Sequence, residues 1–486
     1  MAVLDGLKPE KVFENFEAIS QIPHGSGNTK AISDWLVAFA KARDLEYYQD
    51  HLDNVIIIKE ASVGYEDSEP VILQAHIDMV CNQTDDCKKD MSKEGLDLAI
   101  DGDTIYAIGT TLGGDDGIGA AFMLAVLDDD SLSHPRVETV FTTDEETGLY
   151  GAEGIDVAPL KGKRFINLDS EEEGIVTVGC AGGVTGIAEL PVCREALQGK
   201  AYRIKISGLL GGHSGMDIIK GQANAIKALG RLLFELTDLA DARIVEIDGG
   251  VADTVIPVTS GATVVAPDGD KISQLCDKYR GVFAHEFKAD PDFMLELEET
   301  KNEVLPMDES TVRKVLAYLI GTPNGIEQMT FGIDGLPQTS LSLGVLRTLP
   351  AGESASGQEA VQYIFCIRSA VDSECEMLAR RLECQVIALG GSFTREGPYP
   401  GWEYMPVSPL RDKVCEVYHN QTGKDMVIGA MHAGLECGFF AGKIPGLDCI
   451  SIGPNVCDVH TPNETVSISS VTRTWELLVE ALKELR

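Results

Sequence analysis

The spacing of hydrophobic and polar positions changes near residue 186 and divides the chain into two parts. Before this point, short β-branched runs such as NVIIIKE alternate with segments such as DGIGAAFMLAVLDD, which has the length and composition of a helix. Alternating strands and helices are typical of a parallel sheet covered on both faces. After it, runs such as YRIKISG alternate in polarity, which indicates an antiparallel sheet with one solvent-exposed face.

A stretch rich in proline and glycine, REGPYPGWEYMPVSP, marks where the chain returns to its first part. A helix follows it, with Ser408 as N-terminal cap, Pro409 at its first position and Gly423 as its stop. We therefore predict an α/β fold with two domains. The first, residues 1–185 plus 396–486, has a mostly parallel central sheet flanked by helices, and the second, residues 186–395, is an inserted α+β domain.

The charge composition of the chain limits the kinds of molecule that it is expected to bind. The chain has 486 residues, 40 Lys+Arg and 77 Asp+Glu, which give a net charge of -37. The electrostatic field of such a negative charge repels nucleic acid and anionic lipid, and it tolerates metal ions and cationic or zwitterionic small molecules. The N-terminus shows no secretory signal, no run is long enough for a membrane span, and twelve cysteines occur without paired spacing. We expect a cytoplasmic protein with reduced thiols.

Histidine and acidic residues gather where the predicted strands end. His76 and Asp78 lie two residues apart in LQAHIDMV and therefore project to the same side of a strand. In this arrangement an imidazole can bind a metal ion while a carboxylate orients it. In TLGGDDGIGAA, Asp115 and Asp116 occupy a glycine-rich turn that lacks the lysine of a phosphate-binding loop, so a cation explains them better.

Further acids and histidines follow other strands. Glu145 and Glu146 end one of them, in FTTDEETG; one glutamate could bind metal while the other acts as a base, and the pattern does not say which. Asp169 ends a buried run, and His432 and His460 lie in loops after strand-like segments. The carboxyl ends of strands in open α/β sheets form a ligand-binding crevice. Two histidines and three carboxylates can serve two divalent ions if one carboxylate bridges them.

Seven motifs together resemble one known family over essentially the whole chain. They are QAHIDMV, TLGGDDGIGAA, TTDEETGLYGAEG, FINLDSEEEG, GLLGGHSGMDI, HAGLECGFF and SIGPNVCDVHTPNE. The family is the M20 metallopeptidases, and the resemblance is to its bacterial aminoacyl-histidine dipeptidase branch, also called Xaa-His or cytosol non-specific dipeptidases. It implies a zinc-peptidase-like catalytic domain, an inserted lid domain and hydrolysis of dipeptides.

The resemblance also implies a role for each candidate residue. Asp115 would bridge two divalent ions, most often zinc, with manganese or cobalt as alternatives. The peptide bond between Asp115 and Asp116 would be cis. The remaining roles would be His76 and Asp169 as ligands of one ion, Glu146 and His460 as ligands of the other, Asp78 as the residue that orients His76, and Glu145 as general base.

The second domain would meet the substrate. His213, in GGHSGMD, resembles a histidine that stabilises the oxyanion, and Arg368, in FCIRSA, resembles an arginine that pairs with the substrate carboxylate. His432 and Glu436 lie in a loop that lines the substrate pocket in this family. The resemblance further implies a homodimer formed through the lid, with His213 acting on its own subunit or on a partner.

Two other functions fit parts of the same pattern. A deacylase of the same superfamily would remove an acyl group from an N-acyl amino acid. A binding protein could keep the fold without metal ions or catalysis, although retention of the whole ligand set and of Glu145 argues against that reading.

Overall fold

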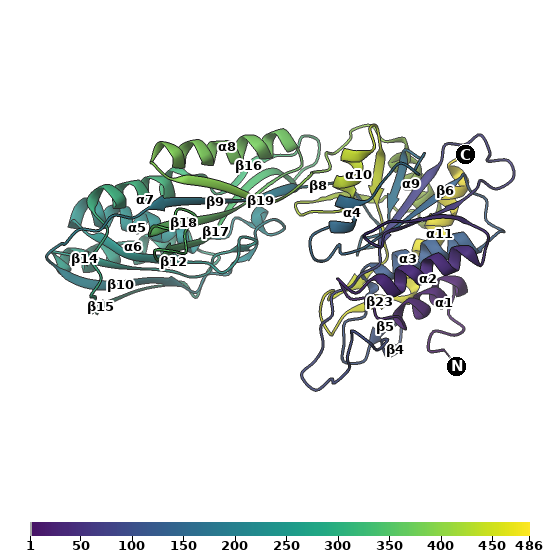
Figure 1. Ribbon diagram of the computed structural model, residues 1–486, viewed down its shortest axis with the longest axis horizontal. Coiled ribbons are helices and arrows are strands. Elements are labelled where there is room, and N and C mark those ends of the chain that lie inside the picture. The colour runs from purple at the N-terminus through teal and green to yellow at the C-terminus, as the bar shows by residue number, and fades with distance from the viewer. Residues whose placement is uncertain (1) are drawn as a thin grey trace. The chain divides into compact units, whose positions relative to one another are not determined.

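The structure is a computed structural model and describes residues 2–486, which form two compact units (Figure 1). Of these residues, the first unit contains 2–179, 402–430 and 435–486, and the second contains 180–401 and 431–434. The predicted boundaries, 185/186 and 395/396, differ from these. Strand β9 already begins at Gly182 and β19 continues to Tyr399, so both flanking segments belong to the second sheet.

An eight-stranded sheet in the order β1-β2-β6-β3-β7-β21-β8-β20 organises the first unit. Its central strands β6, β3, β7 and β21 are parallel, whereas β1, β2 and β8 pair antiparallel with their neighbours. The predicted α/β class is confirmed, but the sheet is parallel only in its centre. The strands are β1 (Glu46–Gln49), β2 (Val55–Lys59), β3 (Val71–His76), β6 (Val137–Thr142), β7 (Arg164–Asn167), β8 (Ile175–Cys180), β20 (Val427–Met431) and β21 (Asp448–Ser451).

Helices flank this sheet in Figure 1. Helix α3 packs against β3 and α1, and α9 packs against β21 and α11. The predicted caps of α9 are confirmed: Ser408 Oγ accepts the Arg411 N–H at 3.0 Å, and Gly423 ends the helix with φ 70°. The helices are α1 (Glu10–Ser20), α2 (Lys30–Lys41), α3 (Gly114–Asp128), α4 (Tyr150–Gly154), α9 (Pro409–Thr422), α10 (Cys437–Lys443) and α11 (Ile468–Glu484).

A small antiparallel sheet in the order β22-β23-β5-β4 completes the first unit. The hydrophobic pattern does not reveal it, because its strands have two to four residues and are too short to show a period. Its strands are β4 (Leu98–Asp101), β5 (Thr104–Ala107), β22 (Val456–Cys457) and β23 (Thr465–Ser467).

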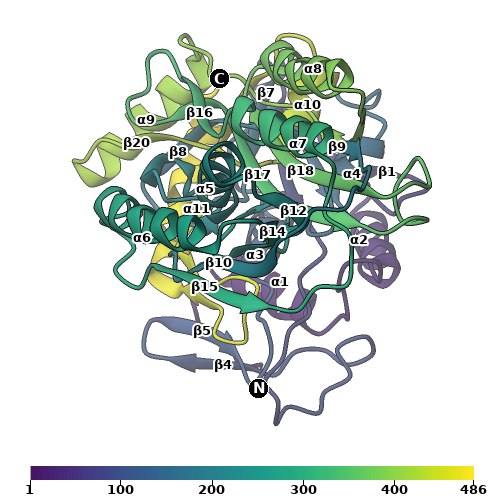
Figure 2. The same ribbon diagram turned by 90° about the vertical axis from the view of Figure 1, so that its left-hand side faces the viewer.

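The second unit has a nine-stranded sheet in the order β15-β10-β14-β12-β17-β18-β9-β19, with β16 beside β17. All of its pairings are antiparallel. Helices α5 to α8 share one hydrophobic core with the strands and lie along one face of the sheet (Figures 1 and 2). On β10, Ile204 and Ile206 are buried while Lys205 between them is exposed. The predicted alternation is therefore confirmed.

The bounds in the second unit are as follows. The strands are β9 (Gly182–Pro191), β10 (Lys200–Ser207), β11 (Gly212–His213), β12 (Arg243–Gly249), β13 (Val255–Ile256), β14 (Ser260–Ala266), β15 (Met294–Thr300), β16 (Gly325–Met329), β17 (Pro337–Leu349), β18 (Ala360–Ser369) and β19 (Ser392–Tyr399). The helices are α5 (Ala225–Ala240), α6 (Gly269–Glu286), α7 (Glu309–Gly321) and α8 (Asp372–Ala388), with a 3₁₀ turn at Ile218–Lys220. Within residues 2–486, no helix is both long and apolar enough to cross a bilayer.

Candidate metal centre

The register of three parallel strands places the predicted ligands of the first unit at one edge of its sheet. His76, the last residue of β3, lies opposite Thr142, the last residue of β6. Gln74 lies opposite Asn167, the last residue of β7. The acids that follow β6 and β7 therefore emerge beside His76, as expected at the carboxyl ends of parallel strands.

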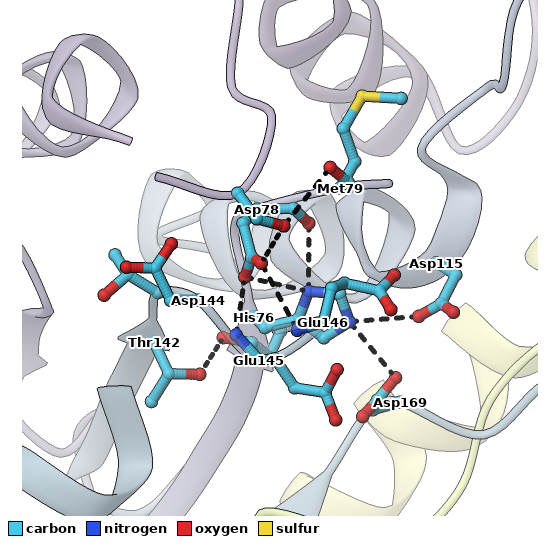
Figure 3. A network of polar contacts seen from close by, with 12 residues as sticks. His76, Asp78, Met79, Asp115, Thr142, Asp144, Glu145, Glu146 and Asp169 are labelled. Atoms are coloured by element: carbon cyan, nitrogen blue, oxygen red, sulfur yellow. Dashed lines mark hydrogen bonds and ion pairs between the residues drawn. The ribbon is translucent and has the colours of Figure 1, made fainter. Parts of the chain in front are cut away.

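The imidazole of His76 lies between carboxylates (Figure 3). Its Nε2 is 3.0 Å from Asp115 Oδ1 and 3.6 Å from Asp169 Oδ1. Its Nδ1 is 3.0 Å from the backbone oxygen of Asp78 and 3.5 Å from Asp78 Oδ1. With Nδ1 donating to Asp78, Nε2 is the nitrogen free to bind a metal ion.

His460 approaches the other oxygen of Asp115. Its Nε2 is 3.3 Å from Asp115 Oδ2 and 2.9 Å from Glu146 Oε2. Asp115 thus presents one oxygen toward His76 and the other toward His460, and the structure brings all five predicted ligands together. The expected cis peptide bond between Asp115 and Asp116 is present.

The donor set fits a divalent metal ion. Glu146 Oε1 is buried and has no hydrogen-bond partner among residues 2–486, and one ligand atom each of His76, Asp115 and Glu146 lies within 4.8 Å of the others. Nitrogen and oxygen donors of this kind suit zinc, manganese and cobalt.

The charges of the cluster also favour cations. Burial raises the pKa of Asp169 to about 8, and the neighbouring Asp115 adds to this shift. Burial alone would lower the pKa of His76, but the carboxylates of Asp169 and Asp115 raise it well above its ordinary value. Hydrogen bonds to Asp115 and Glu146 raise the pKa of His460 to about 10. Divalent ions would compensate this concentration of buried negative charge.

Asp78 connects this centre to the two glutamates. Its Oδ1 accepts the backbone N–H of Glu145 at 3.0 Å, and its Oδ2 accepts the hydroxyl of Ser26 at 2.8 Å and the N–H of Glu146 at 3.4 Å. One buried carboxylate therefore fixes the ring of His76 and the turn that carries both glutamates. Sequence patterns predict its contact with His76 and give no sign of the contacts with Ser26 and the turn.

A second buried network lies among the residues that precede the ligands. Glu436 Oε2 accepts hydrogen bonds from Gln74 Nε2 at 2.5 Å and from the hydroxyl of Thr142 at 2.7 Å. Gln74 Oε1 accepts the amide of Asn167 at 2.7 Å. Burial raises the pKa of Glu436 to about 7. Glu436 is wholly buried within the first unit, and its carboxylate supports β3 and β6 through these contacts.

The remaining three predicted site residues, His213, Arg368 and His432, belong to the second unit and surround Gly215. A Cβ on Gly215 would lie 2.1 Å from the backbone oxygen of His432 and 3.1 Å from both Arg368 Nε and His213 Cε1. His213 Nδ1 accepts the N–H groups of Gly215 and Met216 at 3.2 and 3.0 Å. The neutral ring of His213 therefore carries its proton on Nε2 and can donate it.

Arg368 is 4% exposed, and its Nη1 donates to the hydroxyl of Tyr399 at 2.6 Å. Its buried Nε has no hydrogen-bond partner among residues 2–486. His432 Nε2 is 2.7 Å from the hydroxyl of Ser340, and burial, reinforced by Arg368, lowers the pKa of His432 to about 4. Sequence reasoning missed Tyr399 and Ser340, because neither stands in a motif with a recognisable spacing.

Comparison with known proteins identifies the family. The model of peptidase family M20/M25/M40 matches residues 72–484. The chain belongs to this family. This M20 peptidase is 35% identical to the cytosol non-specific dipeptidase of Escherichia coli strain K12, over 100% of this chain and 99% of that protein. The predicted resemblance is confirmed.

Comparison with solved structures leads to the same family. The M20 peptidase matches aminoacylhistidine dipeptidase from Vibrio alginolyticus with a TM-score of 0.94 and 34% identity, over 99% of this chain and 98% of that chain. An aminopeptidase, PepT, from Bacillus cereus shares the fold at a TM-score of 0.56 and 15% identity, with 99% of each chain covered. Membership of a peptidase family confirms the predicted class of enzyme, a hydrolase of peptide bonds.

Proposed function

We propose that this M20 peptidase is a cytoplasmic dipeptidase that uses two divalent metal ions, most often zinc. The observation that carries the proposal is the position of Asp115, whose two oxygens face two separate histidine–carboxylate pairs, His76 with Asp169 and His460 with Glu146. The names of the Escherichia coli and Vibrio alginolyticus relatives support dipeptides as substrates.

The ligands divide between the ions as follows. His76 and Asp169 would hold one ion, Glu146 and His460 the other, and Asp115 both. When bound, two divalent ions polarise the carbonyl of the scissile bond and lower the pKa of the attacking water.

Glu145 acts as the general base. It takes a proton from the attacking water and returns it to the leaving amine. Burial raises the pKa of its carboxyl well above the ordinary value, with contributions from the charges of Asp169 and Glu436. Its backbone N–H donates to Asp78, and Glu146 rather than Glu145 contributes an oxygen to the group of ligand atoms that lie within 4.8 Å of one another.

The second unit supplies the contacts with the rest of the substrate. His213 donates its Nε2 proton to the oxyanion, and the guanidinium of Arg368 pairs with the substrate carboxylate. His432 lines the substrate pocket, whereas Glu436 is wholly buried within the first unit and supports β3 and β6, the strands that lead to the ligands. The second unit serves as lid and as the contact of a homodimer, in which His213 acts on its own subunit or on the partner's substrate.

Replacing Asp78 by asparagine should weaken zinc binding by about 10- to 100-fold. Asparagine keeps the shape of the side chain but offers one acceptor oxygen in place of two, while His76 and two backbone N–H groups need acceptors. Competition with a chromogenic chelator measures the affinity. Asp50→Asn is the matched control, because Asp50 likewise accepts two backbone N–H groups but lies outside the centre. Equal affinities in the two variants would contradict the role of Asp78.

A substrate panel tests the proposed function. Turnover of β-Ala-His, Ala-Ala and an N-acetyl amino acid is compared after loading with zinc, manganese or cobalt. We expect hydrolysis of the dipeptides, and activity confined to the N-acetyl compound would instead establish a deacylase. A chain that binds less than one metal ion after zinc loading would be a non-catalytic binding protein.

A further inference from the structure

Glu464 is a buried acid to which the proposed reaction assigns no part. It is 2% exposed and lies four residues after His460, directly before β23. Strand β23 is held between β22 and β5, with Val466 opposite Val456 on one side and Ile105 on the other. The position of Glu464 is therefore set by sheet pairing on both sides.

The carboxylate of Glu464 accepts four consecutive backbone N–H groups. Its Oε2 accepts those of Leu112 at 2.8 Å and Gly113 at 3.1 Å, and its Oε1 accepts those of Gly114 at 2.7 Å and Asp115 at 3.3 Å. These N–H groups precede the regular part of α3, where no backbone oxygen of the helix can accept them. A carboxylate at this position is favoured both by the hydrogen bonds and by the helix dipole.

The two glycines of TLGGDD permit this contact. Gly113 has φ 66°, a left-handed conformation that turns successive N–H groups toward one side. A Cβ on Gly114 would lie 2.4 Å from Val466 Cγ2 and 3.3 Å from Glu464 Oε1. A side chain at Gly114 would therefore push the carboxylate and β23 away from the turn.

Glu464 also belongs to the turn that carries His460. The N–H of Glu464 donates to Thr461 at 3.1 Å, and the hydroxyl of Thr461 donates to the backbone of Asp458 at 2.7 Å. Asn82 Nδ2 donates to the backbone oxygen of His460 at 2.8 Å. Glu464 thus joins the turn of one ligand, His460, to the backbone of another, Asp115.

We propose that Glu464 is a positioning residue, whose carboxylate holds the 112–115 turn so that Asp115 presents one oxygen to each half of the metal centre. This inference rests on the proposed dinuclear function and deepens it. Asp115 is the one ligand common to both halves, so a small rotation of its backbone disturbs both ions together. Removal of the Glu464 carboxylate therefore weakens metal binding, although Glu464 itself does not touch the metal ions.

The test compares Glu464→Gln with Glu138→Gln. Glutamine places an NH₂ group against two of the four N–H donors and so loses two hydrogen bonds. Glu138 is the control: it is fully buried and accepts the N–H groups of Lys161 and Gly162 at 2.8 and 3.0 Å and the guanidinium of Arg136 at 2.8 Å, and all of these partners lie outside the centre. Zinc affinity is measured by chelator competition on the metal-free protein, and thermal unfolding is followed on the same samples. The values of kcat and KM are measured after the protein has been reloaded with zinc.

Glu464→Gln should lower zinc affinity by about 10- to 100-fold and reduce kcat with little change in KM. Glu138→Gln should lower the unfolding temperature and leave affinity and kcat unchanged. If Glu464→Gln lowers only the unfolding temperature, Glu464 is structural and the inference is overturned. If the wild-type chain binds no zinc, both the proposed function and this inference are overturned. If the wild type and Glu464→Gln both bind zinc tightly, only this inference is overturned.

If Glu464→Gln does not fold, Gly114→Ala tests the same contact between Glu464 and the 112–115 turn. It keeps the carboxylate but displaces it through the contact with Val466. We expect a comparable loss of zinc affinity, and partial recovery in Gly114→Ala/Val466→Ala, where the clashing methyl group is gone. Unchanged affinity in Gly114→Ala would overturn the inference.

Discussion

Replacing Glu145 by glutamine is expected to lower kcat for a dipeptide by about 10²- to 10⁴-fold while the metal content stays unchanged. Glutamine fills the same space but cannot take a proton from water. The backbone of Glu145 remains fixed, because its N–H and not its side chain donates to Asp78 at 3.0 Å. Steady-state kinetics and elemental analysis of the same sample measure both quantities.

Glu172→Gln is the control for this variant, since it removes the same charge from an exposed acid. Its kcat should match that of the wild type. A Glu145→Gln enzyme with nearly normal kcat would exclude Glu145 as the base. Loss of one metal ion in this variant would reverse the assignment of the two glutamates and make Glu145 the ligand.

Replacing Asp115 by alanine should have an effect at both halves of the centre. Because Oδ1 faces His76 at 3.0 Å and Oδ2 faces His460 at 3.3 Å, its removal takes a ligand from each ion. We expect less than two zinc ions per chain and a fall in activity of more than about 100-fold, since even residues that only orient ligands cost 10- to 100-fold. Elemental analysis and dipeptide turnover check the two outcomes.

Two variants place this result in context. His460→Ala removes a ligand from one half only and should retain one tightly bound ion. Asp101→Asn, at the exposed end of β4, should behave as wild type. An Asp115→Ala enzyme that binds two zinc ions with normal affinity would contradict the bridging role.

The hydrophobic pattern predicts the parts of the site that follow long buried strands. His76 is the last residue of the buried strand β3 and Asp169 follows the buried strand β7, and the carboxyl ends of parallel strands meet at one edge. Their proximity could therefore be predicted from the sequence. The choice between Glu145 and Glu146 could not, because adjacent side chains in a turn take directions that only its backbone decides.

Contacts between distant segments escape the pattern altogether. Glu464 reaches the backbone of Leu112 across 352 positions of the sequence, and Glu436 reaches Gln74 across 362. Neither acid is marked by spacing, since its partners are backbone groups or uncharged side chains. The antiparallel edge of the first sheet was missed for a related reason: β1 and β2 are short, and strand direction depends on the connection and not on composition.

The most direct test of a two-metal dipeptidase is a zinc titration of the metal-free protein, followed by the rate of Ala-Ala hydrolysis. We expect almost no activity without zinc and a rate that rises until two equivalents per chain have been added. Full activity in the metal-free protein, or a rate that reaches its maximum at one equivalent, would contradict a two-metal mechanism.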